Sequence, residues 1–562
     1  MTQQNNQDSN QNKLRMIPLG GLGEFGMNCM ALRWQDDIIV IDAGLMFPEE
    51  ELLGVDIVVP DISYLTENRS KVKAILLTHG HEDHIGGLPW ILSELNVPVY
   101  GTEFTLALVE GKLDEHRLLD DADLIEMLPG KRFQIGPFTI QPIRVTHSLV
   151  DCVALAIHTP IGTVLHTGDF KIDLAPPDGK AFDLQAFADL GKDGGILALL
   201  QDSTNVDRPG WTPGEKAVRP RLDEIFGQTK KKLFFSCFSS SITRIGLAFE
   251  LAQKHGRKVA VVGRSMDNAT EIAQDLGYLK VPQGLVIQPG QMRDFPAEKL
   301  LVMISGTQGE PMSALSRAAV NNHKFAKIES GDTVLMSSRV IPGNEKAIYR
   351  VIDHLERRDA NVIHDDGTNG LIHVSGHGSQ EELKLIINLV QPKFVVPVHG
   401  DYRHLKRHAE LAMATGVPQK AVLAEDGDVL EFTKDSVTKN GKITIGRICI
   451  DSGGSIDVVE DVVIRDRKHL SEDGIVLPII AINKATGRAE GTPEIVFRGF
   501  AMDDAQLIAE ARAITQRTLE SSSPEEKQDY GVIKEKIRND LKRFIQKSTS
   551  RRPLIMPVIL EI

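Results

Sequence analysis

The sequence predicts an α/β protein in which two β-sheets are covered by helices, with a second α/β domain inserted and a small α/β domain at the C-terminus. Residues 14–60 alternate short apolar strands with glycine-rich turns, and strand–helix units follow them. Between Trp211 and Gly367, buried strands alternate with helical segments, which is typical of a parallel sheet with flanking helices. After about Gly427 the pattern changes again, which indicates a further domain.

The length and composition are those of an ordinary globular protein of several domains. The 562 residues correspond to roughly three or four domains. The cysteines lie far apart and form no CxxC pair; they are Cys29, Cys152, Cys237 and Cys449. This pattern predicts buried thiols in a reducing compartment and excludes both a disulfide scaffold and a thiolate zinc site.

The N-terminal segment and the net charge bear on location and partners. Residues 1–12 are rich in glutamine and asparagine and lack an apolar stretch, which predicts a disordered tail and no signal peptide. No segment approaches the ~20 continuous apolar residues of a membrane span, so we expect a cytoplasmic protein without a membrane partner. Because the net charge is −13, a nucleic-acid partner would need a local basic groove.

One segment near the N-terminus invites a nucleotide-binding interpretation. Gly20–Gly26 looks like a dinucleotide loop, but Met27–Leu32 continues toward a strand and does not open a long helix. The Rossmann context is therefore missing, and NAD binding is rejected. Ile38–Gly44 is a buried strand that ends in an acidic turn.

The most informative segment is His79-Gly80-His81-Glu82-Asp83-His84, which directly follows the apolar run Ala74–Thr78. Imidazole and carboxylate groups suit zinc, with water or hydroxide completing the coordination shell. Gly80 has no Cβ and would let the backbone turn so that His79 and His81 converge on one ion. The alternative, a solvated polar turn, is disfavoured because ligand types, spacing and the strand–loop–helix context agree.

Further strand ends carry candidate metal ligands. Asp83 and His84 would begin the next helix and face a second ion. His147 ends one apolar strand, Asp169 follows another through a tight Thr-Gly turn, and His399 ends a third. A single such residue more often caps an element or sits satisfied in the core, but the series favours a metal site.

The insert is expected to contain a parallel sheet with helices on its faces. The helix expected at Ile242–His255 has apolar residues at helical spacing and Gly256 as its stop. The expected buried strands are Leu233–Phe235, Val259–Gly263, Leu301–Ile304 and Thr333–Met336.

Two polar loops have both a functional and a structural interpretation. Ser239–Ile242 starts a helix, where free backbone N–H groups and hydroxyls could bind a phosphate or the serine could simply be an N-cap. His373–His377 has an imidazole at each end, with Ser375 and Gly376 between them. It suits close approach to an anion, and the alternative is a surface loop with two exposed histidines.

The C-terminal region is expected to begin with a linker and a first strand, between Lys442 and Asp451. Ser523–Glu526 has the form of a capping box with proline at the first helical position. An apolar stripe follows, of the kind that packs a core or contacts a partner. It consists of Ile533, Ile537, Leu541 and Phe544.

Taken together, the motifs resemble those of the metallo-β-lactamase superfamily, its β-CASP nuclease branch and, most closely, the bacterial ribonuclease J family. The resemblance covers nearly the whole chain. It rests on Leu19–Glu24, Phe47–Glu50, Thr78–His84, Asp202–Asn205, Gly263–Met266, Gly306–Pro311, His373–Gly378, Arg465–Arg467 and Arg551–Pro553. The chain departs from the family pattern in having Ser239-Ser240-Ser241 for the usual Ala-Ser-Asn, and Asp401 for the glutamate common after His399-Gly400.

The resemblance implies a metallo-β-lactamase αββα sandwich with an inserted β-CASP domain and a small C-terminal α/β domain. The implied ranges are a disordered tail at 1–12, the metallo-β-lactamase domain at 13–210 and 368–440, the β-CASP domain at 211–367, a linker at 441–464 and a C-terminal oligomerisation domain at 465–562. The protein would form a homodimer or homotetramer and could join an RNA-degradation complex with a helicase or other ribonucleases.

The resemblance also implies a catalytic centre with two Zn²⁺ ions per subunit. His79, His81 and His147 would bind one ion, Asp83, His84 and His399 the other, and Asp169 would bridge them. Asp83 and Asp202 would act in catalysis, although Asp202 could equally be a turn residue with Ser203 and Asn205. His377 would serve as general acid or electrostatic stabiliser.

Substrate and further cation sites follow from the same resemblance. The substrate phosphate would be held by Ser240, Ser241, Ile242, His373, Val374, Ser375, Gly376 and His377. A structural cation, Ca²⁺, would be held by backbone oxygens of Leu53 and Val55 with Asp451. Mg²⁺ or Mn²⁺ would support activity.

The implied function is zinc-dependent hydrolysis of RNA phosphodiesters during RNA maturation and decay. The enzyme would act as a 5′-to-3′ exonuclease on single-stranded RNA with a 5′ monophosphate and would also cut internally. Three alternatives stay open at this point. They are a DNA-directed β-CASP nuclease, a thioester or lactam hydrolase without need for the long insert, and a non-catalytic RNA-binding subunit without need for seven metal ligands.

Overall fold

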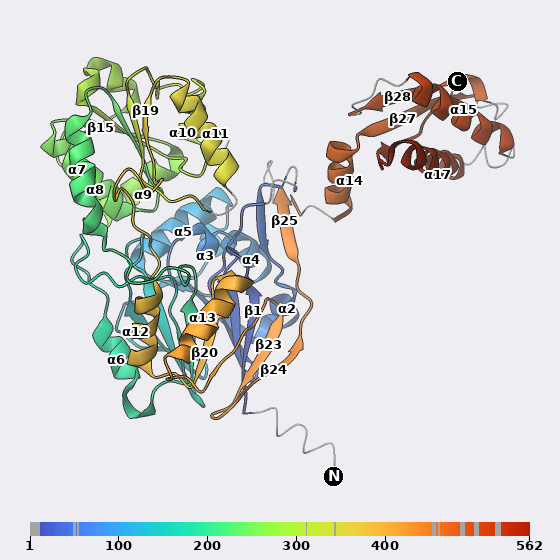
Figure 1. Ribbon diagram of the computed structural model, residues 1–562. Helices are drawn as coiled ribbons and strands as arrows, with labels where there is room; N and C mark the ends of the chain where they lie inside the picture. The colour runs from blue at the N-terminus through green and yellow to red at the C-terminus, as the bar shows by residue number, and fades with distance from the viewer. Residues whose placement is uncertain are drawn as a thin grey trace, which may run out of the picture. The chain divides into compact units, whose positions relative to one another are not determined.

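The computed structural model describes residues 12–48, 52, 55–310, 312–341, 344–451, 457–458, 461–483, 489–499, 505–522 and 530–561. The chain divides into two compact units. One comprises residues 1–47 and 58–447, and the other comprises residues 48–57 and 448–562. Figure 1 labels the helices and strands of both.

Two sheets that pack face to face form the larger part of the first unit. Among the described residues, the first sheet has the order β24 (Val437–Lys442), β23 (Asp428–Phe432), β1 (Leu14–Gly20), β3 (Cys29–Trp34), β4 (Asp37–Ile41), β6 (Val72–Leu76), β7 (Val99–Gly101) and β8 (Leu124–Glu126). The second has the order β22 (Lys420–Ala421), β20 (Phe394–Val398), β13 (Ala198–Asp202), β12 (Gly162–His166), β11 (Val153–Thr159), β10 (Phe138–Arg144) and β9 (Phe133–Ile135).

The strand sequences explain why the sheets stack. In β4, Ile39 and Ile41 pack into the core between the two sheets, whereas Ile38 and Val40 pack into the core beneath the outer helices. Side chains alternate between the faces of a strand, so a continuous apolar run supplies both cores. The predicted sandwich of two sheets covered by helices is therefore confirmed.

Helices cover the outer faces of both sheets. On the first sheet these are α2 (Ser63–Glu67), α4 (Leu88–Glu94) and α5 (Glu103–Glu115), with the short α3 (Glu82–Ile85) beside the site. On the second sheet they are α6 (Leu184–Leu190), α12 (Gln380–Val390) and α13 (Tyr402–Ala414).

The insert forms a third, fully parallel sheet, as predicted. Its order is β16 (Val286–Ile287), β15 (Lys258–Val262), β17 (Leu300–Ile304), β14 (Leu233–Ser236), β18 (Thr333–Met336) and β19 (Asn361–Ile363). One face packs on α7 (Arg219–Gln228), α8 (Ile242–Lys254) and α9 (Arg264–Asp275). The other packs on α10 (Ala314–Ala319) and α11 (Glu345–Glu356).

The insert leaves and rejoins the second sheet at neighbouring strands. The chain enters it after β13 and returns in β20, and these two strands pair in parallel with Asp202 opposite Val398. The chain leaves β13 at Asp202, on the edge where the candidate ligands lie, and it returns to that edge at the loop of His377, which contacts Asp202, before α12 leads to the start of β20.

The second unit has its own small core. Its sheet is built on β27 (Ile475–Ile482), which pairs with β28 (Ala489–Arg498) in antiparallel and with β29 (Leu554–Ile555) and β30 (Val558–Glu561) in parallel. Helices α15 (Ala505–Ser521) and α17 (Tyr530–Thr549) pack on it. This is the expected small α/β domain.

Two local expectations differ from the structure, and two others fall outside the described residues. Helix α14 (Asp461–Glu472) begins inside the expected 441–464 linker, because no glycine or proline interrupts its run. The stripe on α17 continues at Ile545, which is fully buried, while Phe544 is only partly buried, since successive positions four apart share one helix face. The capping box Ser523–Glu526 and the tail at residues 1–11 lie outside the described residues.

Gly80 is needed for close packing and not for the sharp backbone turn that the sequence suggested. Its backbone φ is not in the left-handed region, and a Cβ at this position would lie 2.6 Å from Leu108 Cδ1 on α5. Close packing against α5, and not a sharp turn, therefore explains the glycine.

Candidate active site

Three strands of the second sheet that carry candidate ligands run in the same direction, and β6 of the first sheet brings a fourth ligand to the same place. β12, β13 and β20 pair in parallel, and β10 runs parallel to β12 because both pair antiparallel with β11. The segments that follow β6, β10, β12 and β20 deliver ligand candidates to that place. In the order of those strands they are His79, His147, Asp169 and His399.

The first cluster contains His79, His81, His147 and Asp169. His81 Nδ1 lies 3.0 Å from His79 Nε2 and 3.2 Å from His147 Nε2. Asp169 Oδ2 lies 3.7 Å from His79 Nε2 and 4.0 Å from His147 Nε2. Atoms bound about 2.0–2.1 Å from a tetrahedral zinc ion lie about 3.3 Å apart, so this spacing fits one shared ion.

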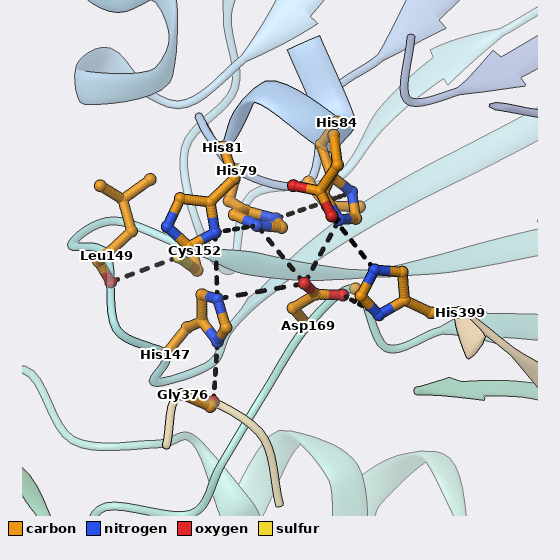
Figure 2. A network of polar contacts seen from close by, with 12 residues as sticks. His79, His81, His84, His147, Leu149, Cys152, Asp169, Gly376 and His399 are labelled. Carbon is orange, nitrogen blue, oxygen red and sulfur yellow. Dashed lines mark hydrogen bonds and ion pairs between the residues drawn. The ribbon is translucent and has the colours of Figure 1, made fainter. Parts of the chain in front are cut away.

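The second cluster contains Asp83, His84, Asp169 and His399. Asp169 Oδ2 lies 3.3 Å from His84 Nε2, and its Oδ1 lies 3.5 Å from His399 Nδ1. Asp83 Oδ2 lies 3.2 Å from His399 Nε2 and 3.6 Å from His84 Nε2. Asp169 thus belongs to both clusters, and Figure 2 shows its carboxylate between the surrounding imidazoles.

Hydrogen bonds behind the imidazoles fix which nitrogen faces the site. His84 Nδ1 lies 2.8 Å from Asp42 Oδ2 and His147 Nδ1 lies 2.7 Å from the Gly376 carbonyl, as Figure 2 shows for the latter pair. Each Nδ1 must donate to these acceptors, which leaves Nε2 with its lone pair toward the cluster. A Cβ at Gly376 would lie 2.6 Å from His147 Cε1, so only glycine permits this approach.

The protonation of the first cluster also suits a metal. Burial holds the pKa values of His79 and His147 well below their usual range and lowers the pKa of His81 to about 4. All three imidazoles are therefore neutral near pH 7, the form in which histidine binds metal ions.

The second cluster attracts positive charge. Burial lowers the pKa of His399, but Asp169, Asp202 and Asp83 outweigh it and raise the pKa to about 10. Burial likewise opposes ionisation of Asp83, yet His84 and His399 hold its pKa below the usual range. Carboxylates that draw protons onto neighbouring imidazoles offer the same field to a cation, so the donor set fits a metal ion.

A third group joins Asp202 and His377 to the clusters. Asp202 Oδ2 accepts a hydrogen bond from His377 Nδ1 at 2.8 Å. Thr204 Oγ1 lies 2.7 Å from Asp202 Oδ1 and 2.8 Å from His399 Nδ1. Asp202, which could have been a turn residue only, forms the Asx-type contact to Thr204 and also faces both histidines. Burial lowers the pKa of His377, but the charges of Asp202 and Asp169 outweigh burial and raise the pKa above its usual range.

The loop that carries His377 is held from behind. Asn205 Nδ2 donates to Ser375 Oγ at 2.9 Å and to the His377 carbonyl at 2.8 Å. The buried carboxylate of Glu382 accepts from the N–H groups of Ile172, Thr212 and Ser379 at 2.7–2.8 Å. The loop is therefore part of the scaffold and not an unattended surface turn.

An excess of buried positive charge lies beside His373. Glu215 binds Lys171 Nζ at 2.6 Å and Arg244 Nη2 at 2.8 Å, so two cations share one carboxylate. Among the described residues, Arg244 Nε and His373 Nδ1 are buried without a hydrogen-bond partner. Buried polar atoms normally find partners, so this group is suited to an anion.

The serine turn differs from its expected form. The N–H of Ser241 donates to the Phe238 carbonyl, and the N–H of Ile242 donates to the Ser240 carbonyl. These two amides are occupied within the turn, and the Ile242 side chain is buried in the core. The Ser239 hydroxyl is also hydrogen-bonded within the protein, since its Oγ lies 3.0 Å from Ser265 Oγ. Val374 is buried as well, so its backbone is what it can offer a ligand.

The predicted structural cation site is only partly within the described residues. Leu53 lies outside them, and the side chain of Asp451 is not described. The N–H of Val55 donates to the Leu52 carbonyl at 3.1 Å. The cation site stays a prediction.

The sequence did not identify the residues that support the ligands. Asp42 and Thr78 hold His79 and His84, Asn28 Nδ2 donates to the Asp83 carbonyl at 3.0 Å, and Glu382 holds the His377 loop. Asp42 had a signal, because it ends the apolar strand Ile38–Ile41 just as the ligands end theirs.

Replacing Asp42 with asparagine is expected to weaken metal binding about 10–100-fold, the usual cost of losing a partner behind a ligand. Asparagine tolerates the left-handed backbone of residue 42. If its side-chain oxygen accepts from the Thr78 N–H, only its NH₂ faces His84, and an NH₂ group cannot accept the hydrogen bond from His84 Nδ1. Competition with a chelator would measure the affinity. Asp36→Asn, at a side chain that is 81% exposed, is the matched control. Equal affinities in the two variants would contradict this role.

Four family models match the chain. Their descriptions are metallo-beta-lactamase superfamily (residues 22–201), ribonuclease J, beta-CASP domain (230–355), Zn-dependent metallo-hydrolase RNA specificity domain (370–422) and ribonuclease J C-terminal domain (462–562). The matched ranges together include most strands of the three sheets and the small C-terminal core, while β1, β19, β23 and β24 lie outside them.

Several curated proteins are similar over nearly their full length. Ribonuclease J of Thermus thermophilus is 41% identical, covering 100% of this chain and 97% of the relative. Ribonuclease J of Synechocystis is 40% identical, covering 97% and 86%, and ribonuclease J2 of Bacillus subtilis is 39% identical, covering 98% and 99%.

A solved structure supports the fold alone. A protein of unknown function from Enterococcus faecalis V583 superposes with a TM-score of 0.55 at 17% identity, covering 75% of this chain and 100% of that one. Within the described part of the chain, no helix is long and apolar enough to cross a membrane.

Proposed function

The chain belongs to the ribonuclease J family of hydrolytic ribonucleases, and from this premise we propose that it degrades single-stranded RNA from a 5′-monophosphate end and also cuts internally. One observation carries the proposal. Seven ligand candidates form two clusters that share Asp169, directly beside a buried, positively charged group suited to a phosphate. A thioester or lactam hydrolase would have no use for that group.

We propose that each cluster holds one Zn²⁺ ion. His79, His81 and His147 would hold the first ion. Asp83, His84 and His399 would hold the second, and Asp169 would contribute to both sites. When bound, the two ions would lower the pKa of a water molecule and neutralise charge growing on a phosphoryl oxygen. Mg²⁺ or Mn²⁺ could support activity in the same clusters.

His377 is proposed to donate a proton to the leaving oxygen. Its Nδ1–H is committed to Asp202 at 2.8 Å, so Nε2 is the atom available to the substrate. Burial lowers the pKa of His377, but the charge of Asp202 outweighs burial and raises it. The raised pKa favours the protonated imidazole that a general acid needs. Asp83 would orient the second cluster through its contact with His399.

The 5′ monophosphate is proposed to bind at His373. Arg244 Nε and His373 Nδ1 lack partners among the described residues, and Lys171 and Arg244 together exceed Glu215 by one positive charge. A compact terminal phosphate matches this charge and these unpaired atoms. Ser240, Ser241, Ser375 and Gly376 would supply hydroxyl or backbone contacts around it.

Assembly and setting are proposed from the family alone. The C-terminal domain would mediate a homodimer or homotetramer, and the enzyme would act in the cytoplasm in RNA maturation and decay. Association with a helicase or other ribonucleases is part of the same proposal.

The experiment that tests the proposed function compares a single-stranded RNA carrying a 5′ monophosphate with the same RNA carrying a 5′ triphosphate, each with and without chelator. We expect mononucleotides from the monophosphate form, slower internal cleavage of both forms, and no product with chelator. The matched DNA oligomer is the control for sugar specificity. Equal hydrolysis of RNA and DNA would favour a DNA-directed nuclease, and cleavage that is insensitive to the 5′ group would refute the role of the His373 group.

A further inference from the structure

The motif Gly306–Pro311 in the insert has no part in the metal clusters, yet it holds one arginine in place. Gln308 Nε2 donates to the Arg339 carbonyl at 2.9 Å, and its Oε1 accepts from the Ile341 N–H at 2.9 Å. Gly309 has a φ of +77°, and a Cβ there would lie 2.6 Å from the backbone of Ala347 on α11. This motif therefore fixes the turn that presents Arg339.

Arg339 reaches from the insert to the catalytic edge of the sandwich. Its Nη1 donates to Asn205 Oδ1 at 3.2 Å, and Asn205 is the buried residue that binds Ser375 and the His377 carbonyl. Arg208 belongs to the same turn, because its N–H donates to the Asn205 carbonyl at 2.9 Å. Arg339 thus contacts Asn205 through its guanidinium group and Arg208 through its backbone N–H, and Asn205 itself binds the His377 loop.

Neither arginine is neutralised within the described residues. No described carboxylate lies within ion-pair distance of Arg208 or Arg339, and both side chains reach solvent although Arg339 is partly covered. The neighbouring Asp207 is paired instead with Arg403 and Arg407. Burial and the charge of Arg208 both lower the pKa of Arg339, while Asp365 opposes them, which agrees with two cations held close together.

Two neighbouring guanidinium groups without a described carboxylate partner attract an anion. Arginine has five N–H donors in a planar fork that matches phosphate, and the Asn205 contact uses only one of those on Arg339. The pair is distinct from the buried group at His373, because that group is formed by Lys171 and Arg244.

We propose that Arg208 and Arg339 form a phosphate clamp that binds a backbone phosphodiester of the RNA strand, other than its 5′ phosphate and the bond being cut. The inference rests on the proposed function, since it assigns RNA as the ligand. The clamp couples the insert to the sandwich through the strand, because one arginine comes from each. Gln308 is a positioning residue for Arg339.

The test measures binding of a short, non-cleavable 5′-monophosphate RNA, made with 2′-O-methyl and phosphorothioate groups, to the full-length zinc-loaded protein over a range of salt concentrations. Arg208→Gln and Arg339→Gln are each expected to weaken binding about tenfold. The slope of log K against log salt should fall by about 0.7, the value for one phosphate of a single strand. Arg339→Lys should keep the slope while losing part of the affinity.

The control is Arg293→Gln, which removes one charge at an arginine that is 88% exposed and lies beside Asp294. It should bind like the wild type. Gln308→Met should weaken binding severalfold without changing the slope, because the charge stays but is no longer fixed. In turnover of cleavable RNA, the clamp variants should raise KM with little change in kcat.

The outcomes separate the clamp from the proposed function. Wild-type binding and cleavage, with clamp variants indistinguishable from Arg293→Gln, would overturn the clamp alone. A wild type that neither binds nor cuts RNA would overturn both proposals. Loss of the monophosphate preference in the clamp variants would show that these arginines bind the 5′ phosphate, which would also overturn the clamp as stated.

Discussion

Asparagine in place of Asp169 is expected to lower RNA hydrolysis by at least about a thousandfold, because loss of several kcal/mol of transition-state stabilisation corresponds to that factor. Asp169 is the residue common to the clusters, with Oδ2 within 4.0 Å of His79, His84 and His147. An amide has nearly the same shape but no charge, and its NH₂ cannot bind a metal. Both clusters should therefore bind metal less tightly.

Metal content measured by mass spectrometry, alongside hydrolysis of 5′-monophosphate RNA, would test this expectation. Asp435→Asn, at a side chain that is 89% exposed, is the matched control and should retain both properties. The double variant Asp83→Ala with His84→Ala removes ligands from the second cluster alone. It should also abolish cleavage while the fold is kept, and hydrolysis by rigorously purified double variant would refute a need for two clusters.

The second large effect is expected on stability. Replacing Glu215 with glutamine should destabilise the protein by about 3–5 kcal/mol, because Lys171 and Arg244 would keep their charges without a carboxylate. All three side chains are almost completely buried. Thermal unfolding would measure the change. Glu250→Gln, which breaks the surface pair with Arg219, is the control and should cost about 0–1 kcal/mol.

The same group predicts a pH dependence of stability. Burial raises the pKa of Glu215, but Arg244 and Lys171 outweigh burial and lower the pKa to about 2 in the folded protein. A depressed folded pKa means that the stabilising contribution is complete above the unfolded value near 4.5 and is lost as the pH falls toward about 2. The Glu215→Gln variant should therefore lose less stability than the wild type across that interval, and parallel losses would contradict the assignment.

Much of the candidate site could be predicted from the sequence because each ligand type ends an apolar strand. Parallel strands bring such ends together, so the positions of His79, Asp169 and His399 along the chain suffice to group them. Asp42 ends a strand too, but its role depends on the pairing of β4 with β6, where Ile41 lies opposite Leu76. That pairing places Asp42 beside Thr78, and no local sequence pattern predicts the pairing.

The groups proposed to bind phosphate could not be derived in the same way. Arg244 lies in a helix with an apolar stripe, where a charged residue ordinarily faces solvent. It is buried because α8 packs on one face of the insert's sheet, and it reaches Glu215 and Ser337 from distant parts of the chain. The serine turn shows the converse. Its residues were expected to offer free amides, but the turn itself occupies them.

The position of the insert has a consequence for the order in which the enzyme is made. The ligands of the first cluster all precede β13, whereas His399 follows β20, on the far side of the insert. The ribosome therefore adds every ligand candidate of the first cluster before the insert, whereas the Gly376 carbonyl that accepts from His147 and the strand β20 come after it. Only when the insert has been synthesised can β20 take its place beside β13 and supply the last ligand.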